Sequence, residues 1–516
     1  MKKLPLSIQT FRDFTEENYI YVDKTKLIHD LFASGGRYYF LSRPRRFGKS
    51  LLISTLAEIF SGNKELFKGL WIYDKIEWTA HPVIHIDFSK IDFENPEKLK
   101  ESIKKFLNKT AISHGVSLDE GNTYKECFVE LIEKLSAKGK VVILVDEYDK
   151  PITEYMEAGK IGKAKNIRKV LKNFFGIIKG SDAFLQFVFI TGVSKFSRVS
   201  IFSDLNNLRD ITLSKQFAML LGYTETELMH YFGTYIAQLA DEAGMSKNQL
   251  ANHIKHWYNG YSWDGENFVY NPFSILNLFA EKSFENFWFT SGTPTFLIQS
   301  IRRNKSEISE FENLAVGSYT FDSYDIENMD IAALLFQTGY LTIKEISTQG
   351  ITKVKTYHLS YPNKEVRDSF LTYLLGEFSR KDMSFSSRFL KRIDELVKAG
   401  DMEGFIGEIK SLFASIPYNI FIGEREAYYH TIIYLILRLS GAEVRCEDPT
   451  NTGRIDAVLE TAKKIYVMEF KVGSELEALA QIKEMKYYEK YLGKGKEIVL
   501  LGIGFDPEKR NIGNYL

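Results

Sequence analysis

Four short apolar runs in the first 215 residues constrain the fold of this chain more than any other feature of its sequence. They lie at Tyr38–Leu41, Val83–Asp87, Val141–Val145 and Gln186–Ile190, and segments with helical periodicity separate them. Apolar runs of about four to eight residues are typical of strands that are buried on both faces. Strands that alternate with helices predict a mostly parallel sheet with helices on both sides. We therefore expect an α/β domain over residues 1–215.

The rest of the chain divides into two further regions. Residues 216–400 begin with helical periodicity, contain an aromatic-rich break at WYNGYSWDG, and continue as a mixed, winged-helix-like stretch. Residues 401–516 return to an α/β pattern, with a helix, two short strands, a second helix and a final strand. A chain of 516 residues has room for about three domains of ordinary size. We expect these domains at 1–215, 216–400 and 401–516.

Composition excludes several classes of protein. Hydrophobic residues make up 44% of the chain, which is enough for packed cores, and no apolar run approaches the roughly 20 residues of a membrane-spanning helix. Lysine plus arginine and aspartate plus glutamate each total 67, so any basic surface must be local. The two cysteines lie far apart and predict neither a disulfide framework nor a zinc site. The N-terminus lacks the apolar segment of a secretion signal. We expect a cytoplasmic protein with no membrane partner.

The stretch RPRRFGKS, residues 43–50, connects the first predicted strand to a helical pattern. A phosphate-binding loop has the form G-x-x-x-x-G-K-S/T in this context. Gly48 can aim backbone N–H groups at phosphate oxygens, Lys49 supplies charge to the outer phosphates, and the Ser50 hydroxyl binds Mg²⁺. Arg43 replaces the first glycine, which mainly shapes the turn out of the strand. A basic loop that caps a helix by chance is the plain alternative.

A second motif favours the nucleotide site. Residues 140–151 read KVVILVDEYDKP, an apolar strand that runs into two acids. Asp146 fits the carboxylate that holds Mg²⁺ through water, and Glu147 fits the base that polarises the attacking water. Thr191 follows the next strand, where a polar sensor of the γ-phosphate is expected. The expected contacts to ATP are Arg45, Arg46, Phe47, Gly48, Lys49, Ser50, Leu51, Asp146 and Thr191, with Ser50 and Asp146 as ligands of Mg²⁺.

A family resemblance covers most of the chain. RPRRFGKS, VDEYDKP, TGVSKFS, WYNGY and VYNPFSIL occur in this order. Together they resemble the bacterial AAA-ATPase-like family, in which an N-terminal P-loop ATPase is joined to a C-terminal PD-(D/E)XK nuclease-like domain. The resemblance implies that the arginine-rich loop is part of the family pattern, so Arg43 is not peculiar to this protein. It also implies a restriction-endonuclease-like α/β fold for residues 401–516.

The second site can be argued from the residues themselves. Strands at 454–460 and 465–472 are separated by a four-residue loop, a common hairpin length. The register then sets Asp456 opposite Glu469, and alternation places Lys471 on the same face as Glu469. Facing carboxylates repel each other unless a cation lies between them, and a divalent metal fits that place. A bulge in either strand would shift this register.

These residue types are suited to phosphodiester hydrolysis. A metal lowers the pKa of a bound water, and Lys471 can orient that water and stabilise the developing charge. The pattern D…E-x-K resembles the PD-(D/E)XK nuclease superfamily, with Ile455 in place of the proline. The resemblance implies Glu426 as a further metal ligand and Gln481 as a polar residue turned toward the site. The expected catalytic residues are Glu147, Asp456, Glu469, Lys471 and Gln481, and the expected metal ligands here are Glu426, Asp456 and Glu469. A surface hairpin with mixed charges is the alternative.

The segment 483–496 leaves two interpretations open. Its lysines alternate with tyrosines at 487, 488 and 491, which suits a nucleic-acid groove with stacking aromatics. Interspersed glutamates suit a solvated surface equally well. The aromatic-rich WYNGYSWDG is more typical of packing against the ATPase core than of base stacking.

These patterns predict an ATP-driven switch coupled to a metal-dependent nuclease. The expected cofactors are ATP and Mg²⁺, with Mn²⁺ possible at the nuclease-like site, and the expected partner is nucleic acid, with DNA favoured over RNA. Because many P-loop ATPases assemble into oligomers, a homo-oligomer is an open possibility. The alternative is a regulatory or scaffold protein that binds ATP as a signal and keeps the nuclease fold as a non-cleaving binding module. A further alternative is an ATPase that remodels another protein.

Overall fold

A computed structural model gives the fold of the chain as two compact units. It describes residues 2–156, 159–195, 201–202, 205–289, 297, 301, 308–322, 330–349, 354–416 and 425–516. Unit 1 consists of Met1–Asn304 and Asn313–Val366, and unit 2 consists of Lys305–Glu312 and Arg367–Leu516. The three domains expected at 1–215, 216–400 and 401–516 stay a prediction. No helix among the described residues is both long and apolar enough to cross a bilayer.

Unit 1 is built on a five-stranded sheet in which every neighbouring pair is parallel. The strand order is β2-β3-β4-β1-β5. The strands are β1 (Tyr38–Ser42), β2 (Val83–Asp87), β3 (Val141–Asp146), β4 (Leu185–Gly192) and β5 (Arg209–Asp210). The four strands expected from apolar runs are confirmed. The short β5 lacks such a run because it is a two-residue edge strand that needs no burial on both faces.

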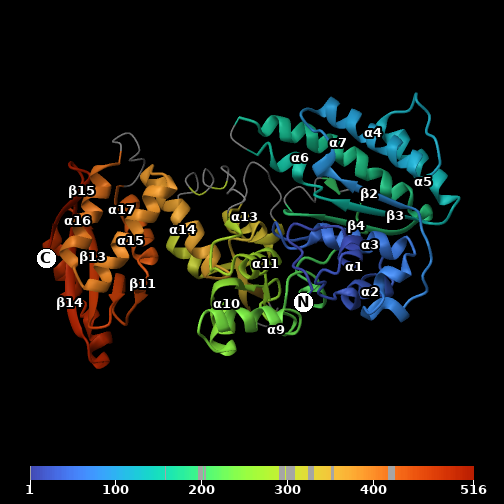
Figure 1. Ribbon diagram of the computed structural model, residues 1–516. Coiled ribbons are helices and arrows are strands. Elements are labelled where there is room, and N and C mark those ends of the chain that lie inside the picture. Colours follow the sequence, from blue (N-terminus) through green and yellow to red (C-terminus); the bar gives the residue numbers. More distant parts are fainter. Residues whose placement is uncertain are drawn as a thin grey trace. The chain divides into compact units, whose positions relative to one another are not determined.

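Helices cover both faces of this sheet (Figure 1). One face carries α3 (Lys49–Phe60), whose Leu52 and Leu56 pack in one core cluster with Leu41 and Leu144 of the sheet. The opposite face carries the layer of α4 (Pro96–Ser113), α5 (Tyr124–Ser136) and α7 (Ile161–Gly180). The shorter helices of this part are α1 (Phe11–Glu16), α2 (Thr25–Ala33) and α6 (Lys150–Thr153). Burial on both faces explains why the strand sequences are almost entirely apolar.

The remainder of unit 1 is mainly helical, as expected. Thr224 and Ser246 begin their helices with complete capping boxes, which fix the starts of α9 and α10. The helices are α9 (Glu225–Glu242), α10 (Lys247–Tyr258), α11 (Pro272–Glu281) and α13 (Ile331–Thr338). The hairpin of β6 (Asn259–Tyr261) and β7 (Val269–Tyr270) precedes α11. An antiparallel sheet follows, in the order β8-β10-β9, from β8 (Leu314–Gly317), β9 (Thr342–Gln349) and β10 (Val354–Ser360). The division between the units falls within α14 (Lys364–Ser379).

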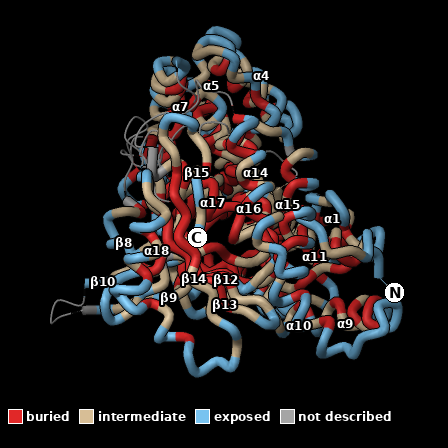
Figure 2. The backbone as a smooth tube through the Cα atoms, turned by 90° about the vertical axis from the view of Figure 1, so that its left-hand side faces the viewer, coloured by how far each residue is buried: buried red, intermediate tan, exposed pale blue. Residues whose placement is uncertain are grey.

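Unit 2 contains a five-stranded mixed sheet in the order β11-β12-β13-β14-β15. β13 and β14 are parallel and the other pairs are antiparallel. The strands are β11 (Glu443–Pro449), β12 (Arg454–Glu460), β13 (Lys464–Val472), β14 (Glu497–Asp506) and β15 (Asn511–Tyr515). The helices are α15 (Met383–Ala399), α16 (Met402–Ala414), α17 (Arg425–Leu439) and α18 (Glu475–Glu484), followed by the 3₁₀ helix η10 (Tyr487–Lys494). Figure 2 shows buried residues concentrated along β12, β13 and β14.

Candidate functional site

The loop between β1 and α3 has the backbone of a phosphate-binding loop. Gly48 is the N-cap of α3 and lies in the left-handed region with a φ of 86°, a conformation that favours glycine. Arg46 also has a positive φ, of 65°. Arg43 has no positive φ. The position that usually carries glycine can therefore accept a residue with a side chain in this loop. The first N–H groups of α3 therefore follow a tight turn at the end of a buried parallel strand, an arrangement suited to phosphate.

Arg43 is fully buried beneath the loop. Its Nη1 donates to the carbonyls of Ser42 and Thr212, each at 2.9 Å, and its guanidinium lies 3.8 Å from the centre of the Trp263 ring. Burial lowers the pKa of Arg43 to about 9. Trp263 belongs to the aromatic-rich break, and Phe47 packs edge-on against it and against Tyr261. The prediction that this break packs on the ATPase core is confirmed.

Lys49 is buried at the start of α3. Its ammonium donates to the carbonyls of Arg43 at 3.1 Å and Pro44 at 2.8 Å. Burial lowers the pKa of Lys49, while the carboxylates of Asp146 and Glu147 act in the opposite direction. The lysine amino group therefore lies inside the loop and close to the acids at the end of β3.

The acids after β3 lie beside the start of α3. Asp146 is buried, which raises the pKa of its carboxyl, and the nearby Ser50 hydroxyl acts in the opposite direction. Glu147 has a φ of 50°, which is rare for a residue with a side chain and costs strain energy. A hydroxyl and a carboxylate near each other form a donor set that Mg²⁺ accepts when water completes the shell. The residues present fit the metal.

The end of β4 is held by Thr191 and by Asp149, a residue that the sequence motifs did not single out. The Thr191 hydroxyl donates to the carbonyl of Leu41 at 2.8 Å, inside the sheet. Asp149 is buried and accepts hydrogen bonds from the Val193 amide and from the amide and hydroxyl of Ser194. A third acid in VDEYDKP was the signal that could have identified Asp149. It fixes the segment after β4 beside the loop.

The remaining expected nucleotide contacts differ in their surroundings. Arg46 donates to the carbonyl of Phe287 at 3.3 Å and lies 3.7 Å from the centre of the Phe273 ring. Leu51 is partly buried against the core cluster under α3. Arg45 is exposed. The loop thus presents one exposed arginine and two that are engaged in packing.

In unit 2, four residues separate the last ladder pair of the β12–β13 hairpin, as predicted, although β13 itself begins at Lys464. Glu460 pairs with Ile465, and the ladder runs to the pair Ala457 with Met468. It ends one step before the expected pairing of Asp456 with Glu469. The Phe470 amide donates to the Asp456 carboxylate at 2.8 Å. The predicted ladder pair of Asp456 with Glu469 is therefore wrong. The ladder ends before it, at a fork where the Asp456 side chain bridges the two strands.

The polar side chains at this fork belong to three elements. Glu469 is buried and accepts a hydrogen bond from Gln481, which α18 turns toward it. Burial raises the pKa of Asp456, and the nearby charges of His430 and Lys471 oppose that shift. Glu426 lies in α17, but its side chain lies outside the described residues. Among side chains that the structure does describe, no three of His, Cys, Asp and Glu are grouped as metal ligands.

Close contact between α18 and β14 places Gln481. A Cβ added at Gly502 would lie 2.5 Å from the carbonyl oxygen of Glu475 and 2.6 Å from the nitrogen of Leu479. These are backbone atoms of α18, so the helix can reach this position only because residue 502 has no side chain. Glu469 of β13 and Gln481 of α18 meet as a consequence.

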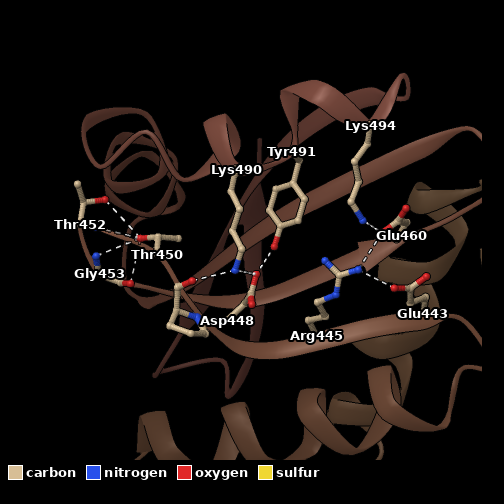
Figure 3. Close-up of polar contacts among 11 residues, drawn as sticks. Glu443, Arg445, Asp448, Thr450, Thr452, Gly453, Glu460, Lys490, Tyr491 and Lys494 are labelled. Atoms are coloured by element: carbon tan, nitrogen blue, oxygen red, sulfur yellow. Dashed lines mark hydrogen bonds and ion pairs between the residues drawn. The ribbon is translucent and has the colours of Figure 1, made fainter.

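The lysine- and tyrosine-rich segment is largely paired within unit 2 (Figure 3). Lys490 contacts Asp448 at 2.8 Å, and Lys494 contacts Glu460 at 2.7 Å. Hydrogen bonds from Lys494 and Lys496 lower the pKa of Glu460 to about 2. Tyr491 is buried and hydrogen bonds to Asp448. Of the two interpretations, these contacts favour a solvated, ion-paired surface over a groove with stacking aromatics.

Comparisons with known proteins find one family match within unit 1 and another within unit 2. The family described as "Predicted AAA-ATPase" matches residues 5–202, and the PD-(D/E)XK nuclease superfamily matches residues 424–515. A protein of Azotobacter chroococcum mcd 1, described as "Uncharacterized protein in vnfD 5'region", is 38% identical over 527 residues, which cover 100% of this chain and 98% of the relative. The chain belongs to the AAA-ATPase-like family with a PD-(D/E)XK nuclease superfamily domain.

The two polar clusters lie in the two matched regions. The loop with Lys49 and the acids after β3 lie inside the first matched region, and the fork at Asp456 lies inside the second. The nuclease superfamily match begins at residue 424, so it includes α17 as well as the mixed sheet and α18.

Proposed function

We propose that unit 1 binds and hydrolyses ATP at the loop between β1 and α3. The observation that carries the proposal is the convergence of Lys49, Ser50 and Asp146 at the carboxyl ends of β1 and β3, the two parallel strands that flank β4. A buried ammonium beside a hydroxyl–carboxylate pair matches the charge distribution of a nucleoside triphosphate with its metal. The N-terminus of α3 contributes its backbone N–H groups and its dipole.

Each residue of this site has a distinct role in the proposal. Lys49 binds the outer phosphates, and Ser50 with Asp146 would hold Mg²⁺, which neutralises phosphate charge when bound. Glu147 accepts a proton from the attacking water. Its backbone lies in the left-handed region, and its carboxylate lies 3.5 Å from the Lys150 ammonium.

We propose that unit 2 acts on phosphodiester bonds of nucleic acid, with DNA as the favoured substrate. The fork carries two carboxylates, Asp456 and Glu469, which would hold a divalent metal with Glu426, and such a metal supplies an activated water. Lys471 orients the attacking water and stabilises charge on the phosphate. Gln481 fixes the orientation of Glu469 through its hydrogen bond.

ATP turnover by purified protein tests the first half of the proposal. Glu147→Gln should bind ATP but lose about 10²-fold or more of the turnover rate, because general-base catalysis contributes that much. Lys49→Ala should lose ATP binding itself. Glu133→Gln, an exposed glutamate on α5, is the matched control and should behave as wild type. Wild-type turnover in the Glu147→Gln variant would contradict the role of the base.

Cleavage assays test the second half. Lys471→Ala and Glu469→Gln should abolish metal-dependent cleavage of plasmid, linear duplex or single-stranded DNA, or of RNA. Lys463→Ala is the control, since Lys463 is an exposed lysine on the same hairpin. If wild-type protein binds nucleic acid but cleaves none of these forms with Mg²⁺ or Mn²⁺, the non-cleaving binding module is the correct function.

A further inference from the structure

The three arginines of the loop lie in three different environments. Arg43 is buried, with both terminal nitrogens donating to main-chain carbonyls. Arg46 is stacked on Phe273 and donates to Phe287. Arg45 is exposed, and its guanidinium makes no hydrogen bond or ion pair within the described part of the chain. Two arginines therefore hold the loop in place, and packing does not account for the third.

The position of Arg45 is set by its neighbour. The ammonium of Lys49 donates to the Pro44 carbonyl at 2.8 Å. That carbonyl is part of the peptide bond that joins Pro44 to Arg45, so the backbone of Arg45 begins beside the ammonium. The arginine side chain is long enough to reach a phosphate group bound there. The positive charge of Arg45 also opposes the positive charge of Lys49, as expected for cations that share one site.

We propose that Arg45 is a further catalytic residue for ATP hydrolysis, one that contacts the terminal phosphate and stabilises its charge in the transition state. This inference rests on the proposed ATPase function of unit 1. In the reaction, water adds to the γ-phosphorus and the bond from that phosphorus to the bridging oxygen breaks. The bonding pair stays on ADP, and the proton of the water passes to Glu147. Charge grows on oxygens that a guanidinium can contact in a bidentate manner.

The proposal means that the loop carries its own transition-state arginine. Many P-loop enzymes receive this charge from another subunit or protein, and an arginine supplied in this way raises turnover by about 10³- to 10⁵-fold. A guanidinium is suited to this role because it remains charged and presents a planar set of donors. With Arg45 in place, a single copy of the chain holds the lysine, the base and the arginine.

Kinetics and equilibrium binding of the full chain test the proposal. The variants are Arg45→Gln, which removes the charge, and Arg45→Lys, which keeps charge without the planar donors. Arg45→Gln should lower kcat by about 10³-fold while the Kd for ATP changes less than about threefold. Arg45→Lys should regain part of the rate. Lys109→Ala on α4 is the control for loss of an exposed positive charge and should leave both quantities unchanged.

A second measurement does not depend on turnover. ADP with aluminium fluoride imitates the transferring phosphate, so wild type should bind this pair much more tightly than ADP alone, and Arg45→Gln should lose the difference. The intrinsic fluorescence of the five tryptophans, all of which lie in unit 1, checks that the variants are folded.

The outcomes separate this proposal from the ATPase function. If Arg45→Gln keeps the wild-type kcat while Glu147→Gln loses it, Arg45 is not catalytic and the ATPase function stands. If Arg45→Gln weakens ATP binding as much as it lowers kcat/KM, Arg45 binds the ground state and the proposal is overturned. If wild type neither binds nor hydrolyses ATP, both are wrong.

Discussion

Arg43 shows how a phosphate-binding loop can form without its first glycine. The backbone at this position has no positive φ, so a side chain is tolerated. The side chain then fills the space under the loop, where it bonds to carbonyls at the end of β1 and near β5 and stacks on Trp263. A residue that breaks the motif in sequence thus supports the loop in structure.

Restoring glycine at this position should therefore destabilise the protein. Arg43→Gly removes two hydrogen bonds of 2.9 Å and a cation–π contact, and it leaves the carbonyls of Ser42 and Thr212 buried without their donor. We expect unit 1 to lose about 3 kcal/mol of unfolding free energy. Urea unfolding followed by tryptophan fluorescence measures this. Arg45→Gly, on the same loop but exposed, should cost about 1 kcal/mol or less. Equal losses in the two variants would contradict the structural role of Arg43.

Glu365 is a buried carboxyl whose ionisation should make stability depend on pH. Burial raises its pKa to about 7 from an ordinary 4.5, although the Trp288 amide and the Ser274 hydroxyl donate to it and act in the opposite direction. Between these two pH values the folded protein keeps a proton that the unfolded chain releases. The free energy of unfolding should thus fall as pH rises from about 4.5 to about 7, by about 3 kcal/mol in total.

The variant Glu365→Gln isolates this contribution, because glutamine keeps the shape and cannot ionise. Wild type should lose stability relative to the variant as pH rises through that window, and the difference should be constant below pH 4.5 and above pH 7. Tryptophan fluorescence during urea unfolding at a series of pH values measures the difference. A difference that does not change with pH would show that Glu365 has an ordinary pKa.

At the scale of elements, the packing of α18 on β14 determines the geometry of the fork in unit 2. Gly502→Ala would drive a methyl group into the backbone of α18 at Glu475 and Leu479. We expect a loss of about 1–3 kcal/mol in unit 2 and reduced cleavage, because α18 must shift and carry Gln481 away from Glu469.

The same substitution elsewhere in unit 2 provides the control for Gly502→Ala. Gly407 lies within α16, and a Cβ there meets no atom within 4 Å, so Gly407→Ala should stabilise the helix by about 0.5–1 kcal/mol. Since all five tryptophans lie in unit 1, a thermal transition seen by circular dichroism but not by tryptophan fluorescence reports on unit 2. Equal shifts of that transition in the two variants would contradict the role of the close contact.

The elements themselves could largely be predicted from the sequence. Buried parallel strands leave continuous apolar runs, so β1 to β4 were visible, and the hairpin of β12 and β13 was visible from its loop length. The hydrogen bonds that side chains form at the strand ends could not be predicted from the sequence. The Thr191 hydroxyl donates to a carbonyl inside the sheet, and the Phe470 amide donates to Asp456, because each group bonds to the nearest partner that the fold supplies. The packing of the arginines was equally hidden, since their partners lie far along the chain.

At the scale of the whole molecule, the two proposed sites lie in different units of one chain. The division between the units falls within α14, which begins at Lys364 beside the buried Glu365. We propose that nucleotide binding in one unit affects nucleic-acid binding in the other. Coupling between two ligands is reciprocal, so ATP should change the affinity for nucleic acid as much as nucleic acid changes the affinity for ATP.

This coupling can be measured with the two sites disabled in turn. ATP with Mg²⁺ should change the Kd of wild type for DNA by about 5- to 150-fold, the usual range for coupled sites. Lys49→Ala should remove that effect, because ATP no longer binds. Lys471→Ala should keep the effect of ATP on DNA affinity while cleavage is lost, since the variant alters chemistry at the second site and leaves the first intact. Fluorescence anisotropy of labelled DNA, titrated with and without ATP, distinguishes these cases. If the DNA affinity of wild type is the same with and without ATP, the two units work independently, and the chain is two enzymes in one polypeptide rather than a nucleotide-controlled nuclease.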